Sequence, residues 1–249
     1  MPSPSGPPAT VCQVLHTLKV GGAEVLAARL ARRLGGRFRF VFACLEEAGA
    51  LGEQLRDEGF RVAVIGRREG LDGRCPLRLA RFFRAEGVAL VHAHQYTPFF
   101  YSAAARLLYR RPPILFTEHG RHFPDYPRRK RKLANRLLLR RRDRVVAVGG
   151  AVRKALIDNE GIPAARVRVV YNGIDTDRFA PSAAADREDA RRELGLAPGD
   201  FAVLQVARLD YLKDHPTAVR AVGRVAGVLP GTRLLLAGEG PELEKVRAE

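Results

Sequence analysis

Short apolar runs alternate with helix-like segments along almost the whole chain, and this alternation limits the fold more than any other feature. Apolar residues are contiguous in the strand-like runs, whereas the segments between them show helical spacing. We expect strands at residues 11–16, 38–45, 61–65, 90–93, 113–117, 144–148, 167–171, 201–206 and 233–237. We expect helices at residues 23–34, 76–85, 99–109, 128–141, 151–159, 187–194 and 216–228, and from 241 onward. This order predicts an α/β fold of right-handed βαβ units, in which helices cover both faces of parallel sheets.

The expected strands fall into a large and a small group. Residues 11–174 form a first Rossmann-like domain, and the Pro/Ser-rich residues 1–10 before it are expected to be disordered. Residues 175–200 are predicted to be a linker with one short helix, because they contain two prolines and no strand pattern. Residues 201–249 then begin a second domain. Two parallel strands do not form an independently stable sheet, so we interpret this second Rossmann-like domain as incomplete.

The net charge of +16 comes largely from one segment. Between Arg121 and Arg144 the chain has 11 basic and 2 acidic residues, which gives +9. No apolar run approaches the ~18 residues that cross a bilayer, and residues 1–10 do not resemble a signal peptide. We therefore expect a cytoplasmic protein. The three cysteines are isolated and lack metal-ligand spacing, so neither a disulfide framework nor a cysteine metal site is expected.

Three motifs in the first domain follow expected strands directly. They are Gly21-Gly22-Ala23-Glu24, His92-Ala93-His94-Gln95 and Thr117-Glu118-His119-Gly120. The carboxyl ends of parallel strands meet at one edge of a sheet, where ligands bind in open α/β folds. Each motif also has a structural interpretation, since paired glycines can form a plain turn and a single histidine is more often structural. Their convergence on one edge favours a binding site.

Arg208 and Lys213 lie on the loop between the expected strand 201–206 and the helix 216–228. A helix N-terminus with two cations suits a diphosphate better than a single carboxylate. The alternative is a solvated pair of cations on a surface loop. Gly238-Glu239-Gly240-Pro241 follows the last expected strand, where glycines permit close backbone approach.

In this order the motifs, together with the Asn172-Gly173-Ile174-Asp175 turn, resemble the retaining glycosyltransferases of the GT-B fold, family 4 group. The resemblance covers nearly the whole chain after Thr10. It implies two Rossmann-like domains that face each other across a cleft. The first domain would bind the acceptor and the second a nucleotide-sugar donor linked to UDP or GDP.

The resemblance also implies roles for individual residues. The candidate catalytic residues are His119, which would contact the donor sugar, and His94, which would line the acceptor side. Arg208 and Lys213 would hold the donor diphosphate and stabilise the departing nucleotide. The other donor-binding candidates are Gly21, Gly22, Gly238, Glu239 and Gly240, and the hinge candidates are Asn172, Gly173 and Asp175. No cofactor and no metal ion is implied, because two cations can neutralise the diphosphate.

Two departures from the family stand out. Its members carry a Glu-x7-Glu element later in the second domain, which would lie beyond Glu249, so the chain is expected to be truncated and its activity alone is uncertain. Asp214 stands where many relatives have glycine.

The basic segment predicts a helix with one leucine stripe surrounded by cations. One interpretation is that the leucines pack on the sheet and the charges are solvated. The other is contact with an anionic membrane surface, at the inner face of the plasma membrane. Nucleic-acid binding is not expected, because no aromatic residues interleave with the charges. The membrane-contact candidates are Arg128, Arg129, Lys130, Arg131 and Lys132.

Three hypotheses for function follow. The leading one is transfer of a sugar, with retention, from a nucleotide-sugar to a carbohydrate or lipid-linked acceptor, as in polysaccharide biosynthesis. A nucleotide-sugar epimerase of the same architecture is less favoured, because the sequence shows no positioned set of carboxylates. The third is a catalytically inactive fragment or a module that docks on a membrane or a partner.

Overall fold

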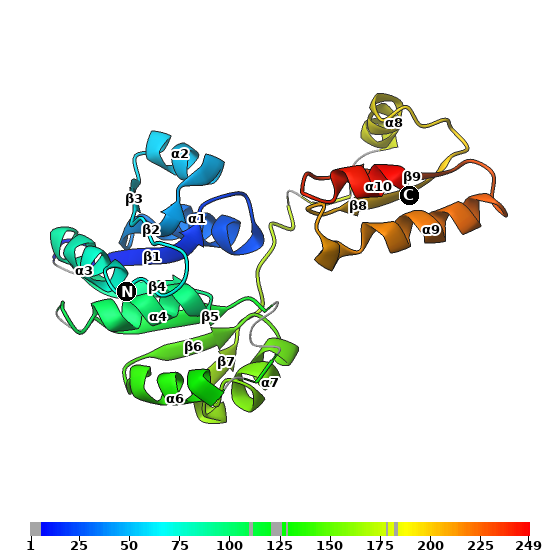
Figure 1. Ribbon diagram of the computed structural model, residues 1–249. Helices are drawn as coiled ribbons and strands as arrows, with labels where there is room; N and C mark the ends of the chain where they lie inside the picture. The colour runs from blue at the N-terminus through cyan, green and yellow to red at the C-terminus, as the bar shows by residue number, and fades with distance from the viewer. Residues whose placement is uncertain (1–5, 110–111, 121–125, 128, 178, 182–183) are drawn as a thin grey trace. The chain divides into compact units, whose positions relative to one another are not determined.

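The computed structural model describes residues 6–109, 112–120, 126–127, 129–177, 179–181 and 184–249. The chain divides into two compact units, Met1–Gly173 and Ile174–Glu249 (Figure 1). The boundary falls inside the turn that was predicted as a hinge. Residues 1–5 of the predicted disordered stretch lie outside the described residues, and the first strand already begins at Thr10.

The first unit contains a fully parallel sheet of seven strands in the order β3-β2-β1-β4-β5-β6-β7. Every predicted strand is confirmed, and the ends differ by at most two residues. Chain order reverses between β1 and β4, so these two strands flank the switch point at which open α/β sheets bind ligands. The strands are β1 (Thr10–Thr17), β2 (Arg39–Glu47), β3 (Arg61–Val64), β4 (Val88–His94), β5 (Ile114–Glu118), β6 (Arg144–Ala147) and β7 (Val167–Val169).

Helices cover both faces of this sheet, as the alternation predicts (Figure 1). On β1, Val11 and Leu15 pack against helices α1 (Gly22–Leu34) and α2 (Gly49–Asp57). Cys12 and Val14 point to the other face, where the second core cluster lies. The helices of that face are α3 (Cys75–Ala85), α4 (Tyr96–Ala105), α6 (Arg129–Leu138) and α7 (Gly150–Asp158), and the short 3-10 turn η1 (Ala164–Arg166) precedes β7.

Helix α2 was not predicted from the sequence. Two glycines weaken its helical signal, since glycine in a helix costs about 1 kcal/mol relative to alanine. Gly52 is nevertheless required by packing, because a Cβ atom there would lie 2.8 Å from the Cβ of Ala48 and 3.3 Å from that of Leu18. The predicted start of α4 at residue 99 was also late. This helix is apolar on most sides and largely buried, so it has no polar face to mark its first turn.

The second unit has a two-stranded parallel sheet, β8 (Phe201–Val206) and β9 (Thr232–Ala237). Leu204 and Val206 share one face of β8, and both are exposed to solvent. The helical elements are α8 (Ala184–Glu193), the 3-10 turn η2 (Tyr211–Lys213), α9 (His215–Ala226) and α10 (Leu243–Ala248). The predicted α/β class is therefore confirmed in both units.

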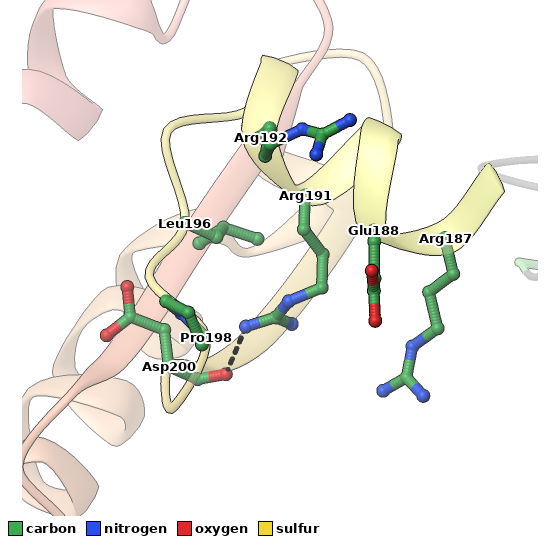
Figure 2. Close-up of a pocket in the computed structure, with 7 residues that line it drawn as sticks. All are labelled: Arg187, Glu188, Arg191, Arg192, Leu196, Pro198 and Asp200. Atoms are coloured by element: carbon green, nitrogen blue, oxygen red, sulfur yellow. Dashed lines mark hydrogen bonds between the residues drawn. The ribbon is translucent and has the colours of Figure 1, made fainter. Parts of the chain in front are cut away.

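Helix α8, predicted as part of a linker, packs within the second unit. The Arg191 side chain donates hydrogen bonds of 2.8 Å to the carbonyl oxygens of Ala197 and Asp200. Figure 2 shows this side chain reaching from α8 to the loop before β8, across an open pocket of about 530 Å³. The pocket is lined by Arg187, Glu188, Arg191, Arg192, Leu196, Pro198 and Asp200.

Candidate functional site

The glycine pair after β1 belongs to a candidate site in the first unit. Gly21 is the N-cap of α1 and has an extended backbone with φ −158° and ψ 167°, a conformation that any residue adopts. A Cβ atom at Gly22 would meet nothing within 4 Å, and one at Gly21 would meet only the Glu24 side chain. Turn geometry therefore does not require either glycine. The missing side chain of Gly22 leaves open space at the start of α1, where a helix N-terminus favours an anion, whereas the Glu24 carboxylate lies against Gly21.

A row of polar side chains crosses three neighbouring strands beside this loop. His94 ends β4, and its Nδ1 lies 3.0 Å from Nε2 of His119, the residue that follows β5. The other nitrogen of His94, Nε2, lies 2.8 Å from Oε1 of Gln13 in β1. His92 lies 2.9 Å, Nε2 to Oγ1, from Thr117. The structure thus brings the two histidine motifs together at the switch point.

The predicted role of His94 needs correction. Its side chain is only 1% exposed, so it does not line a surface on which an acceptor could bind. Burial follows from its place inside the sheet, between Gln13 and His119. His119 is half-buried and remains the histidine that can contact a ligand. Sequence reasoning did not single out Gln13, because one glutamine within an apolar strand carries no motif.

Burial keeps these histidines neutral at neutral pH. It lowers the pKa of His92 to about 3 and the pKa of His119 to about 4. The pKa of His94 is lowered well below its usual range, first by burial and then by its histidine neighbours. Neutral imidazoles can accept as well as donate hydrogen bonds, so the row is a polar network without net charge.

Glu118 shapes the turn that carries His119. Its Oε1 accepts hydrogen bonds from the backbone N–H groups of His119, at 3.0 Å, and Gly120, at 3.2 Å. Gly120 has a φ of +81°, a left-handed conformation that favours glycine. Burial raises the pKa of Glu118 to about 8, although both backbone donors act in the opposite direction. A buried carboxyl group with a raised pKa therefore holds the turn that carries the candidate histidine.

A separate candidate site in the second unit is the cationic loop after β8. Arg208 is exposed, and its guanidinium donates a 2.7 Å hydrogen bond to Oδ2 of Asp210. The other oxygen, Oδ1, accepts from the backbone N–H of Leu212 at 3.1 Å and so caps η2. Lys213 is exposed and forms no ion pair with any residue that the structure describes. As predicted, both cations lie on the loop between a strand and the N-terminus of α9.

Gly238 and Gly240 have a structural reason that the sequence did not reveal. A Cβ atom on Gly238 would lie 2.0 Å from the carbonyl oxygen of Ala207, and one on Gly240 would lie 2.1 Å from that of Leu209. The backbone hydrogen bond from Leu209 N–H to the Glu239 carbonyl, 2.9 Å long, joins the two loops. The close approach is therefore to the neighbouring loop, and it places exposed Glu239 beside Arg208.

Two residues at the start of α9 have unusual environments. The backbone of Asp214 has a left-handed conformation, with φ 47° and ψ 48°, which explains why glycine suits this position. His215 is buried, and neither ring nitrogen has a hydrogen-bond partner among the described residues. Buried polar atoms usually have partners, so His215 is an exception directly after the cationic loop, at the start of α9. His215 was not predicted as unusual, because a single histidine in a helix has no specific sequence pattern.

The predicted membrane-contact residues separate into different environments. Arg128 lies outside the described residues, whereas Arg129 and Lys130 are exposed at the start of α6. Arg131 points inward to Tyr96 and Glu160. Lys132 donates a 2.7 Å hydrogen bond from Nζ to the carbonyl oxygen of Asp158. The prediction is therefore wrong for Arg131, whose guanidinium is committed to the interior.

Neither a metal cluster nor a membrane span is evident in the described part of the chain. No three His, Cys, Asp or Glu side chains there are grouped so that they could hold a metal ion. None of its helices has the length and apolar character to cross a bilayer. The hinge candidates Asn172, Gly173 and Asp175 are exposed around the boundary between the units.

Comparison with known proteins assigns the chain to a family. The sequence pattern of Glycosyltransferase Family 4 matches residues 20–178, which is more than half of the chain. This chain belongs to Glycosyltransferase Family 4. The resemblance seen in the sequence motifs is thereby confirmed, and the match covers both histidine motifs and the glycine pair.

Relatives of this Family 4 chain are longer than it is. EpsF of Bacillus subtilis is 29% identical over 255 residues, which cover 96% of this chain and 64% of EpsF. The D-inositol 3-phosphate glycosyltransferase of Rhodococcus erythropolis is 35% identical over 113 residues, or 45% of this chain and 25% of that enzyme. The chain thus spans less than two thirds of the length of these relatives.

Solved structures share the fold. Anabaena HepE, in complex with UDP and glucose, has a TM-score of 0.77 at 22% identity, covering 96% of this chain and 64% of HepE. UDP-N-acetylglucosamine 2-epimerase from Rickettsia bellii has a TM-score of 0.56 at 16% identity, covering 97% of this chain and 64% of the epimerase. At these identities the likeness concerns the fold alone. Glycosyltransferases and an epimerase share it, so the activity must be argued from the site.

Proposed function

We propose that the protein transfers a sugar, with retention, from a nucleotide-sugar donor to a carbohydrate or lipid-linked acceptor. The observation that carries this proposal is the cationic loop of Arg208 and Lys213, which lies between the carboxyl end of β8 and the N-terminus of α9. Such a loop suits a diphosphate. UDP is the favoured nucleotide, because HepE of the same fold is known in complex with UDP and with UDP-glucose.

The proposed chemistry places positive charge where the leaving group becomes negative. Asp210 holds Arg208 in position, while Lys213 has no ion-pair partner among the described residues and is available to a phosphate. Stabilisation of developing charge by preorganised groups is often the largest contribution to catalysis. We propose that these two cations and the α9 N-terminus perform this task without a metal ion or cofactor.

An aromatic hollow in the first unit supports a carbohydrate acceptor. It has a volume of about 320 Å³ and lies at the start of α4, two residues after His94. Aromatic rings offer flat apolar faces with a polar edge, which suits the face of a sugar ring. The hollow is lined by Arg67, Gly70, Leu71, Tyr96, Thr97, Phe100 and Tyr101.

Incubation with a panel of UDP- and GDP-sugars tests the proposed reaction. We expect release of the free nucleoside diphosphate, measured by phosphorus NMR, and a product whose anomeric configuration matches the donor, measured by proton NMR. Inverted product would contradict retention. Conversion of the donor sugar to its epimer without nucleotide release would favour the epimerase that shares the fold. Turnover of either kind would exclude an inactive docking module.

A separate observation supports contact with an anionic membrane. Leu133 and Leu137 lie one turn apart on α6, and their exposed fractions are 62% and 74%. Arg129, Lys130 and Arg136 are also exposed and form no ion pair with any residue in the described ranges. A neighbouring groove of about 590 Å³ between α6 and residues 161–166 is lined by Lys132, Leu133, Asn135, Arg136, Leu139, Gly161, Pro163 and Arg166.

We propose that this outer face of α6 docks on the cytoplasmic face of the plasma membrane. Each cation near an anionic surface contributes about 1 kcal/mol, and the two leucines add apolar contact. Co-sedimentation with phosphatidylglycerol vesicles is expected, without binding to phosphatidylcholine vesicles. Replacing Leu133 and Leu137 by Ser should weaken binding, whereas the same change at exposed Leu107 and Leu108 should not. If both double variants lost vesicle binding equally, α6 would not be a specific docking face.

A further inference from the structure

The polar row across β1, β4 and the end of β5 has a direction that follows from its donors and acceptors. The Oε1 atom of Gln13 is a carbonyl oxygen and can only accept a hydrogen bond. His94 Nε2, 2.8 Å away, must therefore carry a proton and donate it. In a neutral imidazole the other nitrogen then has a lone pair, so His94 Nδ1 is an acceptor.

The same reasoning applies to the next contact. His119 Nε2 lies 3.0 Å from His94 Nδ1 and must donate to it, so Nε2 of His119 carries the proton. The remaining nitrogen of a neutral His119, Nδ1, is left as an acceptor. All three histidines of the row have lowered pKa values because they are buried, which makes the neutral form the relevant one near pH 7.

We infer that Gln13 and His94 are positioning residues that fix neutral His119 in its Nε2–H tautomer and so present its Nδ1 lone pair to a substrate hydroxyl group. A hydrogen bond on one ring nitrogen commonly sets the role of the other. A lone pair at this position attracts a hydroxyl donor and repels a phosphate or carbonyl oxygen. The tautomer does not depend on the proposed function, whereas the identity of the hydroxyl, that of a sugar, rests on it.

Nitrogen-15 NMR of histidine-labelled protein near pH 7.5 tests the inference directly. Two-bond and three-bond proton–nitrogen correlations distinguish the two neutral tautomers of an imidazole. We expect the Nε2–H form for His119, assigned by its loss in His119→Asn. The Nδ1–H form, or a mixture of both, would overturn the inference, because it would mean that Gln13 presents its amide N–H and reverses every donor in the row.

Two matched variants test the cause. Gln13→Met keeps the side-chain length but removes the acceptor, so His119 should change to a mixture of tautomers. Thr117→Val removes the 2.9 Å contact between Thr117 and His92. This change should leave the tautomer of His119 as it is in the unaltered protein. An unchanged His119 spectrum in folded Gln13→Met would overturn the role of Gln13. If Gln13→Met does not fold, the spectrum of the unaltered protein still shows whether His119 is in the Nε2–H form.

The ligand side of the inference has its own measurement. In the transfer reaction, donor and acceptor sugars that each lack one hydroxyl group are compared with the complete sugars. The loss of one particular hydroxyl should raise KM or lower kcat in the unaltered protein but not in His119→Asn. If every deoxy sugar affects both proteins equally, the hydroxyl contact is overturned. A protein that shows the Nε2–H tautomer but no sugar transfer would contradict the proposed function and leave the positioning role intact.

Discussion

Arg131 lies over the ring of Tyr96, with 3.6 Å between its guanidinium carbon and the ring centroid. Its NH1 atom also forms a 2.9 Å ion pair with Oε1 of Glu160. The side chain of Arg131 is 12% exposed, and that of Glu160 is 1% exposed. One cation of the basic segment therefore joins α6 to α4 and to the end of α7, and it belongs to the structure of the first unit.

Replacing Arg131 should therefore destabilise the protein. We expect Arg131→Ala to lower the free energy of unfolding by about 3 kcal/mol, because it removes a cation–π contact and the cation that faces the buried Glu160 carboxylate, which keeps its hydrogen bond from Asn135. Urea denaturation followed by circular dichroism measures the change. The control is Lys130→Ala, which removes an exposed cation and should cost less than about 0.5 kcal/mol. Equal effects of the two variants would contradict an interior role for Arg131.

Gln95 stores backbone strain beside the candidate site. It follows His94 with φ 69° and ψ 171°, a region that residues other than glycine rarely occupy. Gln95→Gly should raise the free energy of unfolding by about 1 kcal/mol. The same change at Gln54, in the middle of α2, should lower it by about 1 kcal/mol. Chemical denaturation of both variants provides the comparison, and a loss of stability in Gln95→Gly would disprove the strain.

Glu118 should make stability depend on pH. Its folded pKa of about 8 lies above its ordinary value of 4.5. The folded state therefore binds a proton more tightly than the unfolded state, and this contribution is present below pH 4.5 and is lost as pH rises to about 8. In Glu118→Gln, which has no carboxyl group at this position, the stability should not fall in this way as pH rises. The measurement is the difference in unfolding free energy between the two proteins from pH 5 to pH 9. A difference that stays constant over this range would show that the carboxyl group is already ionised.

The two loops of the second unit should not tolerate a side chain between them. In Gly240→Ala the new Cβ atom would lie 2.1 Å from the Leu209 carbonyl oxygen, so the loops must separate. We expect a loss of about 2 kcal/mol in unfolding free energy and weaker nucleotide binding. Gly223→Ala, inside α9 with nothing within 4 Å of the new atom, should instead stabilise by about 0.5–1 kcal/mol. Thermal unfolding of the pair distinguishes the sites.

Much of the fold could be predicted because the strands are contiguous apolar runs buried between two layers of helices. The same logic placed the motifs at the carboxyl ends of strands, where the structure has them. The order of the strands could not be predicted, because it depends on contacts between distant segments. Gln13 and His94 illustrate this, since their hydrogen bond joins residues 81 positions apart.

Other features were hidden for local reasons. The run from Arg129 to Lys132 reads as uniform positive charge, yet only the folded helix shows which guanidinium points inward. Gly238 and Gly240 were predicted to let the backbone approach a nucleotide. The sequence could not show that the approaching group is the backbone of residues 207–209.

Nucleotide binding tests the central claim most directly. Calorimetric titration with UDP, and with GDP for comparison, should show binding that Arg208→Ala weakens by about 10- to 100-fold, since charge-assisted hydrogen bonds contribute about 1.5–3 kcal/mol. Arg220→Ala removes another exposed arginine of the second unit, paired with Glu249, and should bind normally. Binding lost only in Arg208→Ala would establish the cationic loop as the diphosphate site. Failure of the unaltered protein to bind either nucleotide, or equal binding by Arg208→Ala, would contradict it.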